Sequence, residues 1–339
     1  MANKTARLGD LATYINGYAF KPADWGETGL PIIRIQDLTG NSYQLNRYDG
    51  EYPERIEVND GDVLISWSAS LGVYVWQRGK ALLNQHIFRV VFDKLPVNKD
   101  YFVFAVEHKL AEMESKTHGA TMKHIVKKDF DGTTIPYPPI EKQAEIADHL
   151  RRITSLIDRQ TEQLLLLDQL VKSRFIELFG DPIKNTQHRP TTAFVNVVTM
   201  QRGFDLPVQD REQSGNIPVY GSNGVLDHHN QAKVCNGGVI TGRSGTIGKV
   251  FYTKGAYWPL NTTLFSVDTH ENNIIYLAHL LKMFNLARFT EGTGVPTLNR
   301  NKFHSAPIID VPIDEQNQFA AFVEQTDKSK LCSKMEVAA

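Results

Sequence analysis

Hydrophobic residues recur every seven positions through a stretch near the middle of the chain, from Glu141 to Phe179. One series runs Leu150, Ile157, Leu164, Val171 and Leu178, and a companion series runs Ile146, Ile153, Gln160, Leu167 and Arg174. This spacing is the a/d seam of a coiled coil. Pro136-Tyr-Pro-Pro139 keeps the chain extended before the stretch, and Gly180-Asp-Pro182 ends it. We therefore expect a single helix of about 39 residues, roughly 58 Å long.

The alternative for this stretch is a long core helix of one globular domain. An average helix has only about 11 to 12 residues, so a seam of this length favours pairing with another helix.

The residues before the helix, 1 to 140, mix short apolar runs with turn residues. Helical patterns cover only Arg7 to Tyr14 and Tyr101 to Glu114. The short apolar runs predict strands at 31–35, 62–66, 73–76 and 86–92. This order without a regular strand–helix alternation predicts an α+β domain.

The same order of short motifs recurs after the long helix. Ile15-Asn-Gly17-Tyr18 matches Gln201-Arg-Gly203-Phe204, and Leu30-Pro31 matches Ile217-Pro218. The segment 61–72 matches 237–248, each followed by a glycine (Gly79, Gly255) and an asparagine (Asn84, Asn261). Segment 130–143 aligns without gaps to 303–316. We conclude that two divergent copies of one unit fill the chain.

The second copy closes with a weaker seam. Phe319 and Val323 are apolar, but the following seam positions are mostly polar, and the sequence stops at Ala339. We expect a short distal helix over 314–339, which would leave the first helix's seam from about Leu164 to Leu178 exposed.

Composition agrees with a soluble protein of two medium-sized cores: 339 residues, 41% hydrophobic and 22% charged. Cys235 and Cys332 cannot form a disulfide framework, and the sequence contains no leader and no membrane-length apolar run, so we expect a cytoplasmic protein. The formal net charge is −1, and only residues 181–313 are net positive, with 12 Lys and Arg against 9 Asp and Glu. DNA binding therefore requires local basic loops or a partner.

Several catalytic motifs are approached but not matched. Gly242 to Lys249 has the wrong glycine spacing for a P-loop, and Gly242-Arg-Ser244-Gly245 has its second glycine too early for a nucleophile elbow. Tyr137-Pro-Pro139 lacks the Asn or Asp of an amino-methyltransferase motif, and the histidines show no metal-ligand spacing. We expect no catalytic and no metal site.

Polar loops occupy matching places in the two copies, around 116–128 and 292–302. Arg can read guanine and Asn or Gln can read adenine, so these loops are candidate readers of DNA bases, although solvated loops have the same composition.

Taken together, these features resemble the specificity subunit of type I restriction-modification enzymes. The resemblance covers nearly the whole chain. Its most specific marks are Gly119-Ala-Thr-Met-Lys-His124, Pro138-Pro-Ile-Glu-Lys-Gln143 with the heptads behind it, Leu178-Phe-Gly-Asp-Pro182, Thr293 to Arg300, and Val311-Pro-Ile-Asp-Glu-Gln316.

The resemblance implies two repeated α+β target-recognition domains separated by long helices that form an antiparallel coiled coil. It places domain 1 at 1–140, the central conserved helix at 141–180, domain 2 at 181–313 and the distal helix at 314–339. Each domain would read one half of a bipartite, asymmetric DNA target. The chain would be non-catalytic and bind no cofactor, because S-adenosylmethionine belongs to the two methyltransferase subunits that dock on the helices, and the restriction subunits attach through these.

The candidate DNA-binding residues are Arg34, Gln36, Ser66, Trp67, Ser68, Lys116, His118, Thr121, Lys123, His124, Arg202, Tyr220, Ser222, Asn223, Arg243, Ser244, Thr246, Thr297, Asn299 and Arg300. The candidate helix-interface residues are Ile146, Leu150, Ile153, Ile157, Gln160, Leu164, Leu167, Val171, Leu178, Phe319 and Val323.

The short distal helix departs from the family pattern. We expect a methyltransferase subunit, a second copy or a separate fragment to cover the exposed part of the seam. Two other functions remain open: a self-sufficient restriction or methylation enzyme, for which the chain offers little room, and a coiled-coil scaffold unrelated to DNA.

Overall fold

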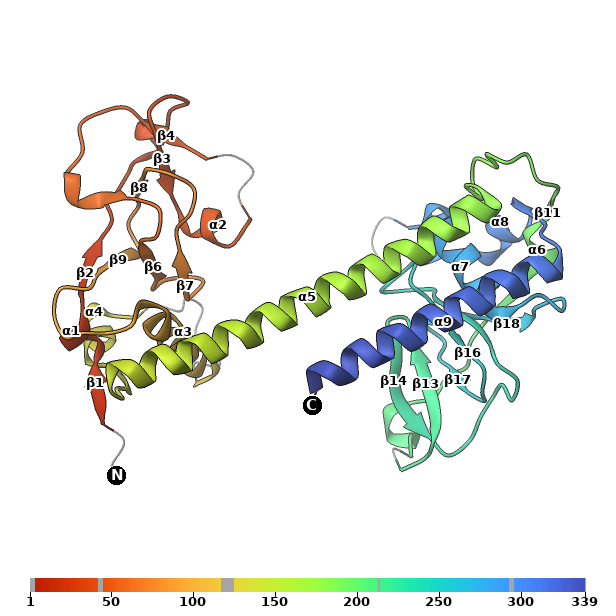
Figure 1. Ribbon diagram of the computed structural model, residues 1–339. Helices are drawn as coiled ribbons and strands as arrows, with labels where there is room; N and C mark the ends of the chain where they lie inside the picture. Colours follow the sequence, from red (N-terminus) through yellow and green to blue (C-terminus); the bar gives the residue numbers. More distant parts are fainter. Residues whose placement is uncertain (1–3, 42–44, 117–124, 213, 293–295, 339) are drawn as a thin grey trace. The chain divides into compact units, whose positions relative to one another are not determined.

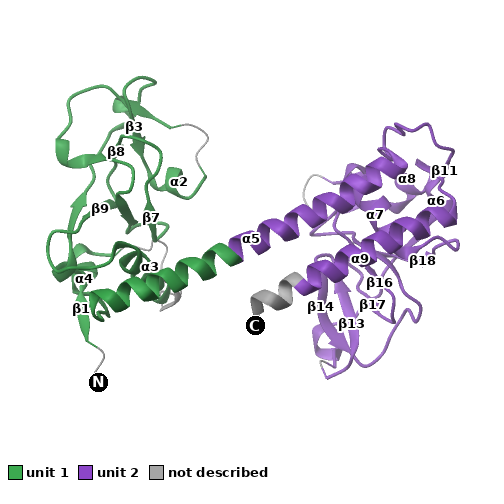
Figure 2. Cartoon of the chain, viewed as in Figure 1, with its two compact units in different colours: residues 1–156 green, residues 157–339 purple. Residues whose placement is uncertain are grey.

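The computed structural model describes residues 4–41, 45–116, 125–212, 214–292 and 296–338. The chain divides into two compact units, residues 1–156 and 157–339 (Figure 2). The long helix α5 (Ile140–Phe179) begins in the first unit and ends in the second (Figure 1). Its 40 residues agree with the single helix that the heptads predict.

Unit 1 contains two four-stranded sheets, in the orders β2-β9-β6-β7 and β4-β3-β8-β5, and the pair β1-β10. Its strands are β1 (Thr5–Arg7), β2 (Thr13–Asn16), β3 (Leu30–Ile33), β4 (Arg47–Tyr48), β5 (Glu57–Val58), β6 (Val63–Ser66), β7 (Gly72–Val75), β8 (Ala81–Leu83), β9 (Ile87–Val91) and β10 (Thr134–Pro136). Its helices are α1 (Leu8–Leu11), α2 (Ile35–Leu38), α3 (Lys99–Lys116) and α4 (Lys127–Gly132).

Unit 2 repeats this plan with the sheet orders β12-β18-β15-β16 and β14-β13-β17 and the pair β11-β21. Its strands are β11 (Thr191–Ala193), β12 (Thr199–Arg202), β13 (Ile217–Gly221), β14 (Gly224–His229), β15 (Gly238–Gly242), β16 (Val250–Thr253), β17 (Trp258–Pro259), β18 (Thr263–Asp268), β19 (Thr290–Glu291), β20 (Thr297–Leu298) and β21 (Pro307–Ile309). Its helices are α6 (Phe194–Val197), α7 (Ile274–Phe284), α8 (Arg300–His304) and α9 (Ile313–Ala338).

The central strand of each unit is buried on both faces, which explains its continuous apolar run. In β6, Val63 and Ile65 belong to the core that includes Phe102 of α3, whereas Leu64 faces the core of the second sheet. This alternation follows from the period of two along a strand. The two repeated α+β units predicted from the sequence are therefore confirmed.

A glycine needed for close backbone approach marks the repeat. A Cβ on Gly17 would lie 2.0 Å from the carbonyl oxygen of Asn84, and a Cβ on Gly203 would lie 2.3 Å from that of Leu260. Only glycine allows strands to approach so closely. The structural counterpart of Asn84 is thus Leu260, and the sequence-based pairing with Asn261 is wrong by one residue.

Two local predictions in unit 1 are also wrong. The expected helix from Arg7 to Tyr14 is a single turn, α1, followed by strand β2. The strand that the sequence predicts to Ile35 ends at Ile33, because the Asp37 carboxylate accepts a hydrogen bond from the Arg34 backbone N–H at 2.8 Å and starts α2. Local side-chain capping wins over the apolar pattern in this segment.

The first turn of each long helix, α5 and α9, contains a buried glutamine. Gln143 accepts a hydrogen bond from the backbone N–H of Asn98, which precedes α3, and donates one to the carbonyl oxygen of Pro138. Gln316 does the same with Asn273, which precedes α7, and with Val311. In each unit one side chain therefore fixes the start of the long helix to the start of the helix that covers the sheet.

Helix α9 packs antiparallel against the C-terminal part of α5 within unit 2 (Figure 1). The Phe319 ring contacts the rings of Phe175 and Phe179, with centroids 5.4 and 5.6 Å apart. Farther along, Lys330 of α9 forms an ion pair with Asp168 of α5 at 2.7 Å. The order of these contacts sets the antiparallel direction.

The expectation that the seam from Leu164 to Leu178 is exposed is wrong. Val171 is buried, and Leu178 packs against the core of unit 2. The physical reason is that α9 starts beside the C-terminal end of α5, so antiparallel pairing covers that end first. Among the other predicted seam positions, the side chains of Leu150, Ile153 and Ile157 are exposed. Those of Ile146, Gln160, Leu164 and Leu167 are half-buried, and those of Phe319 and Val323 are buried.

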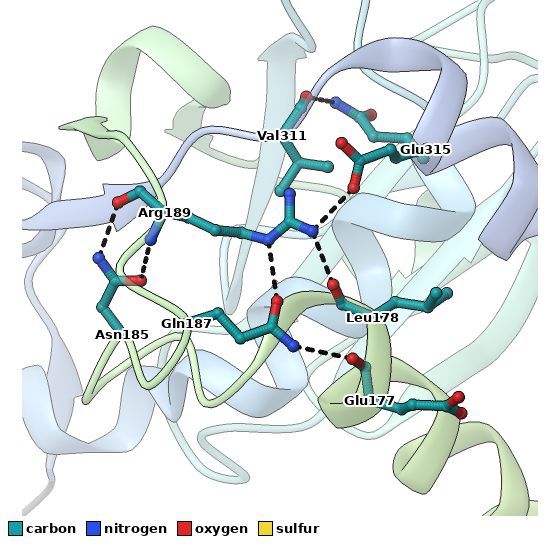
Figure 3. A network of polar contacts seen from close by, with 8 residues as sticks. Glu177, Leu178, Asn185, Gln187, Arg189, Val311 and Glu315 are labelled. Atoms are coloured by element: carbon teal, nitrogen blue, oxygen red, sulfur yellow. Dashed lines mark hydrogen bonds and ion pairs between the residues drawn. The ribbon is translucent and has the colours of Figure 1, made fainter.

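A polar network closes the end of α5 (Figure 3). The Arg189 guanidinium donates to the carbonyl oxygen of Leu178 at 2.7 Å and pairs with the Glu315 carboxylate of α9 at 2.8 Å. Gln187 donates to the carbonyl oxygen of Glu177 and accepts from Arg189. The carbonyl oxygens of Glu177 and Leu178, which the helix end leaves unpaired, are satisfied, and the start of α9 is attached to the end of α5. Among the described residues, no helix is long and apolar enough to cross a membrane.

Candidate nucleic-acid interface

Three loops of unit 2 meet at one end of its main sheet. The loop after β15 is tied to β20 by a hydrogen bond from the Leu298 N–H to the Arg243 carbonyl oxygen, 2.8 Å long, and by a bridge between Ser244 and Thr297. Lys249 donates to the side chain of Asn223, which follows β13, at 2.6 Å. Loops distant in sequence thus form one polar surface.

The loop from 242 to 249 owes its shape to glycine. A Cβ on Gly242 would lie 1.8 Å from the carbonyl oxygen of Thr246, and Gly245 and Gly248 have positive φ angles of 80° and 88°. The glycines that resemble a phosphate-binding loop in the sequence therefore serve a tight turn between β15 and β16.

A pocket with a volume of about 400 Å³ opens beside this turn. Leu264 and Leu298 contribute apolar side chains, and the polar lining consists of Arg202, Arg243, Glu291, Thr297, Asn299, Arg300 and Asn301. Five of these seven polar residues are predicted from the sequence as DNA-binding candidates. Glu291 and Asn301 are not among the predicted residues, although both lie at or in the polar loop around 292–302.

The three arginines of the pocket differ in their partners. Arg202 donates to the Asn261 carbonyl oxygen at 3.4 Å and lies 3.9 Å from the Asp205 carboxylate. The guanidinium groups of Arg243 and Arg300 have no hydrogen bond or ion pair with any other residue that the structure describes. Arg243 is half-buried, and Arg300 is exposed at the start of α8.

Asn299 and Glu291 hold each other inside the pocket. The Asn299 side chain accepts from the Asn301 N–H at 3.1 Å, which caps α8, and donates to Glu291 at 2.8 Å. Lys302 also pairs with Glu291, and the hydrogen bonds from Lys302 and Asn299 hold the pKa of Glu291 below its usual value. The pocket therefore contains a fixed, ionised carboxylate.

His304 supports the strand that carries Arg202. Its Nε2 accepts a hydrogen bond from the Met200 backbone N–H at 3.2 Å, a role that requires neutral imidazole. Burial, followed by the neighbouring Arg300, lowers the pKa of His304. The neutral ring is thus the favoured form in the folded unit.

Unit 1 has an equivalent backbone hydrogen bond, but the residue that accepts it carries a different side chain. The Ile125 N–H donates to the Trp67 carbonyl oxygen at 3.0 Å, the counterpart of the bond between Leu298 and Arg243. The Trp67 ring stacks on Phe88 at 5.4 Å and meets the His86 ring edge-on at 5.0 Å. A tryptophan that packs inward replaces the arginine of the pocket.

Several predicted readers have other roles in the structure. Ser66 is buried and donates to the carbonyl oxygens of Ser68 and Ser70, and Ser68 is buried as well. Tyr220 is buried against the Tyr257 ring. These three side chains are buried and the Trp67 ring stacks on Phe88, so the structure does not support base reading by these four residues. His118, Thr121, Lys123, His124 and the side chain of Lys116 lie outside the described residues.

The remaining candidates lie on the surface. Arg34 pairs with Asp37 at 3.3 Å and its guanidinium lies over the Trp25 ring, beside exposed Gln36. Ser222, Ser244 and Thr246 are half-buried and Asn223 is exposed in the polar loops of unit 2. Among the described residues, no three His, Cys, Asp or Glu side chains gather as metal ligands.

Comparison with known proteins agrees with this arrangement. The chain is 29% identical to the EcoBI specificity subunit of a type I restriction enzyme from Escherichia coli over 168 residues, 49% of this chain and 35% of that protein. It is 26% identical to the MjaVIII specificity subunit of Methanocaldococcus jannaschii over 180 residues, 52% of this chain and 41% of that protein. The matches thus span less than half of these relatives. A putative specificity subunit of Mycoplasma pneumoniae is 22% identical over 296 residues, 83% of this chain and 76% of that protein.

Solved structures show the same fold. The S subunit of the type I restriction-modification system of M. genitalium superposes with a TM-score of 0.66 at 14% identity, covering 99% of this chain and 92% of that one. A chain from a structure on the assembly and conformational transition of the type I system gives 0.56 at 15% identity over the same shares. The family model described as the type I restriction modification DNA specificity domain matches residues 2–167 and 196–335. The chain therefore belongs to the family of type I restriction-modification DNA specificity subunits.

Proposed function

We propose that this chain is the non-catalytic DNA sequence-specificity subunit of a type I restriction-modification complex. Each repeated unit reads one half of a bipartite, asymmetric target. The observation that carries the proposal is the contrast at one backbone position: the same hydrogen bond holds Trp67 in unit 1 and Arg243 in unit 2. Two readers with one scaffold and different side chains recognise two different half-sites.

The reading regions are residues 1–140 and 181–313. Residues 141–180 form the spacer, and 314–339 form the distal helix that pairs with it. A helix of 40 residues is about 60 Å long, and its proposed role is that of a spacer, so that the base pairs between the two half-sites are not read.

The methyltransferase subunits dock on α5. Leu165, Leu166 and Leu170 are exposed apolar residues on this helix, off the face that α9 covers, and Leu150 to Ile157 adds exposed residues on the seam. Apolar surface of this kind marks contact sites between proteins. S-adenosylmethionine belongs to those subunits, and restriction subunits join through them.

The test is an electrophoretic shift assay on random duplex DNA, with the full chain alone and with its cognate methyltransferase subunits. We expect the complex to select a split consensus and the chain alone to transfer no methyl group. A complex without sequence preference, or methylation by the chain alone, would refute the proposal.

Substitutions on α5 test the proposed docking of the methyltransferase subunits. Leu166→Gln with Leu170→Gln should weaken assembly with the methyltransferase subunits in size-exclusion chromatography while the melting temperature stays unchanged. Arg159→Gln, an exposed change on the same helix outside these apolar positions, is the control.

A further inference from the structure

We propose that the pocket of unit 2 reads one G·C base pair, with Arg243 on the guanine and Glu291 on the cytosine, while Arg300 contacts the adjacent phosphate. The proposal rests on the proposed function and names the chemistry of one of its two half-sites.

The uncommitted donors of the pocket point to guanine. Asn299 is the residue that would read adenine, but its side chain already caps α8 and donates to Glu291. The Arg243 guanidinium has no partner among the residues that the structure describes, and a guanidinium matches the O6 and N7 acceptors of guanine in the major groove.

Arg243 and Arg300 are held differently. The Arg243 backbone is fixed on both sides, since its N–H donates to the Thr262 carbonyl oxygen at 2.8 Å and its own carbonyl oxygen accepts from Leu298 at 2.8 Å. Its half-buried side chain starts from a rigid base, as the geometry of base reading requires. Arg300 is exposed on the first residue of α8, where a cation suits a phosphate that tracks the surface.

Glu291 distinguishes a base edge from a phosphate inside the pocket. Its ionised carboxylate would repel a phosphate placed between it and Arg243. A G·C pair offers both partners, because guanine presents two acceptors and the cytosine N4 amino group presents a donor that a carboxylate accepts. Lys302 and Asn299 hold this carboxylate without using all its acceptor positions.

The experiment uses the full chain assembled with its methyltransferase subunits. The consensus is first selected from random duplexes for the unchanged complex. In each G·C pair of the consensus, the guanine is then replaced by 7-deazaguanine, which lacks the N7 acceptor. In a second set of duplexes, the cytosine is replaced by N4-methylcytosine, which hinders the amino donor. At one pair in one half-site we expect each replacement to weaken binding about 5- to 150-fold.

Arg243→Lys separates base reading from charge. It should abolish the preference for guanine at that pair while other positions stay selected, because lysine keeps the charge but not the planar fork. Arg300→Lys should leave the consensus unchanged, whereas Arg300→Ala should weaken binding to all duplexes alike and reduce the salt dependence by about one ion. Glu291→Ala should remove the penalty of N4-methylcytosine, because alanine offers the amino group no acceptor. Arg159→Lys, an exposed exchange on α5, is the control for the substitution itself.

The outcomes separate the two proposals. If the unchanged complex shows no consensus, the proposed function fails. If it shows a consensus that Arg243→Lys leaves intact at every position, or if Arg243→Lys weakens all duplexes equally, the pocket does not read a base pair and only this inference is overturned. Circular dichroism melting of each variant excludes misfolding as the cause.

Discussion

The two units carry chemically different side chains at one equivalent backbone position, Trp67 in unit 1 and Arg243 in unit 2. In unit 1 the Trp67 ring stacks on Phe88, whereas in unit 2 Arg243 and Leu264, the counterpart of Phe88, line an open pocket. The hydrogen bond that places both residues runs between backbone atoms. A scaffold built on backbone bonds and buried glutamines allows the loop side chains to change without loss of the fold.

The strongest test of the shared scaffold uses the equivalent core residues Phe130 and Phe303, both fully buried. Phe130→Ala and Phe303→Ala should each cost about 3 to 5 kcal/mol of unfolding free energy, because each leaves a cavity. Hydrogen exchange followed by unit should show the loss in unit 1 for the first variant and in unit 2 for the second. Equal loss in both units for either variant would show that the units do not fold separately.

A fall in pH should destabilise unit 2 more than unit 1. His279 of α7 is packed edge-on to Phe319, and burial lowers its pKa to about 4, whereas unit 1 has Phe104 at the corresponding position. The unfolded histidine has a pKa of about 6.5, so the unfolded state binds the proton first as the pH falls. Unit 2 should therefore keep this stability above pH 6.5 and lose up to about 3 kcal/mol between pH 6.5 and 4.

The matched control for this pH dependence is His279→Phe, which places the residue of unit 1 in unit 2. Chemical denaturation at pH 7.5, 6, 5 and 4 should give a smaller loss for the variant than for the unchanged chain. Identical pH profiles would show that other groups of the α5–α7–α9 contact set the acid response.

The junction glutamines should behave alike in the two units. Gln143→Ala and Gln316→Ala each leave a buried N–H and a buried carbonyl oxygen without a partner, which should cost about 1 to 3 kcal/mol. Urea denaturation measures both. If only one variant lost unfolding free energy, the hydrogen bonds of the two glutamines would contribute unequally to the stability of the two units.

The ion pair between Asp168 and Lys330 should have the smallest effect. The Asp168 side chain is 70% exposed, and exposed pairs contribute only about 0.2 to 1 kcal/mol. A double-mutant cycle with Asp168→Ala and Lys330→Ala should give a coupling energy in that range, reduced by salt. A much larger value would indicate that the charges, rather than the phenylalanine cluster, hold α9 on α5.

The sequence predicts the features that repeat with a simple period. Heptads specify α5, and the four motifs in the same order specify the two units. The covered half of the seam was assigned wrongly because Val171, Phe175 and Phe179, spaced four residues apart, turn their common face toward the core of unit 2. That packing depends on where α9 begins in space, which a linear pattern does not contain.

The sequence predicts the residues of the pocket only in part, because it shows which residues are polar but not which side chains are available. Arg243, Asn299 and Arg300 stand out as polar residues in glycine-rich loops. Whether a side chain is available depends on its neighbours, however: Asn299 is bound to its own helix start and to Glu291, and Ser66 bonds inside its own turn. Hydrogen-bond partners of this kind are set by three-dimensional contacts.

The pairing of α5 with α9 also determines when unit 2 can fold during synthesis. The core of unit 1 is complete once α5 has begun, but unit 2 combines Phe175 and Phe179 with Phe319, which is translated much later. Phe319 follows Phe179 by 140 residues, so at about 5 to 20 residues per second the aromatic end of α5 waits about 7 to 28 s for its partner on the ribosome. During that interval the nascent chain exposes an aromatic, aggregation-prone segment. Folding of unit 2 should therefore depend on chaperones more than folding of unit 1.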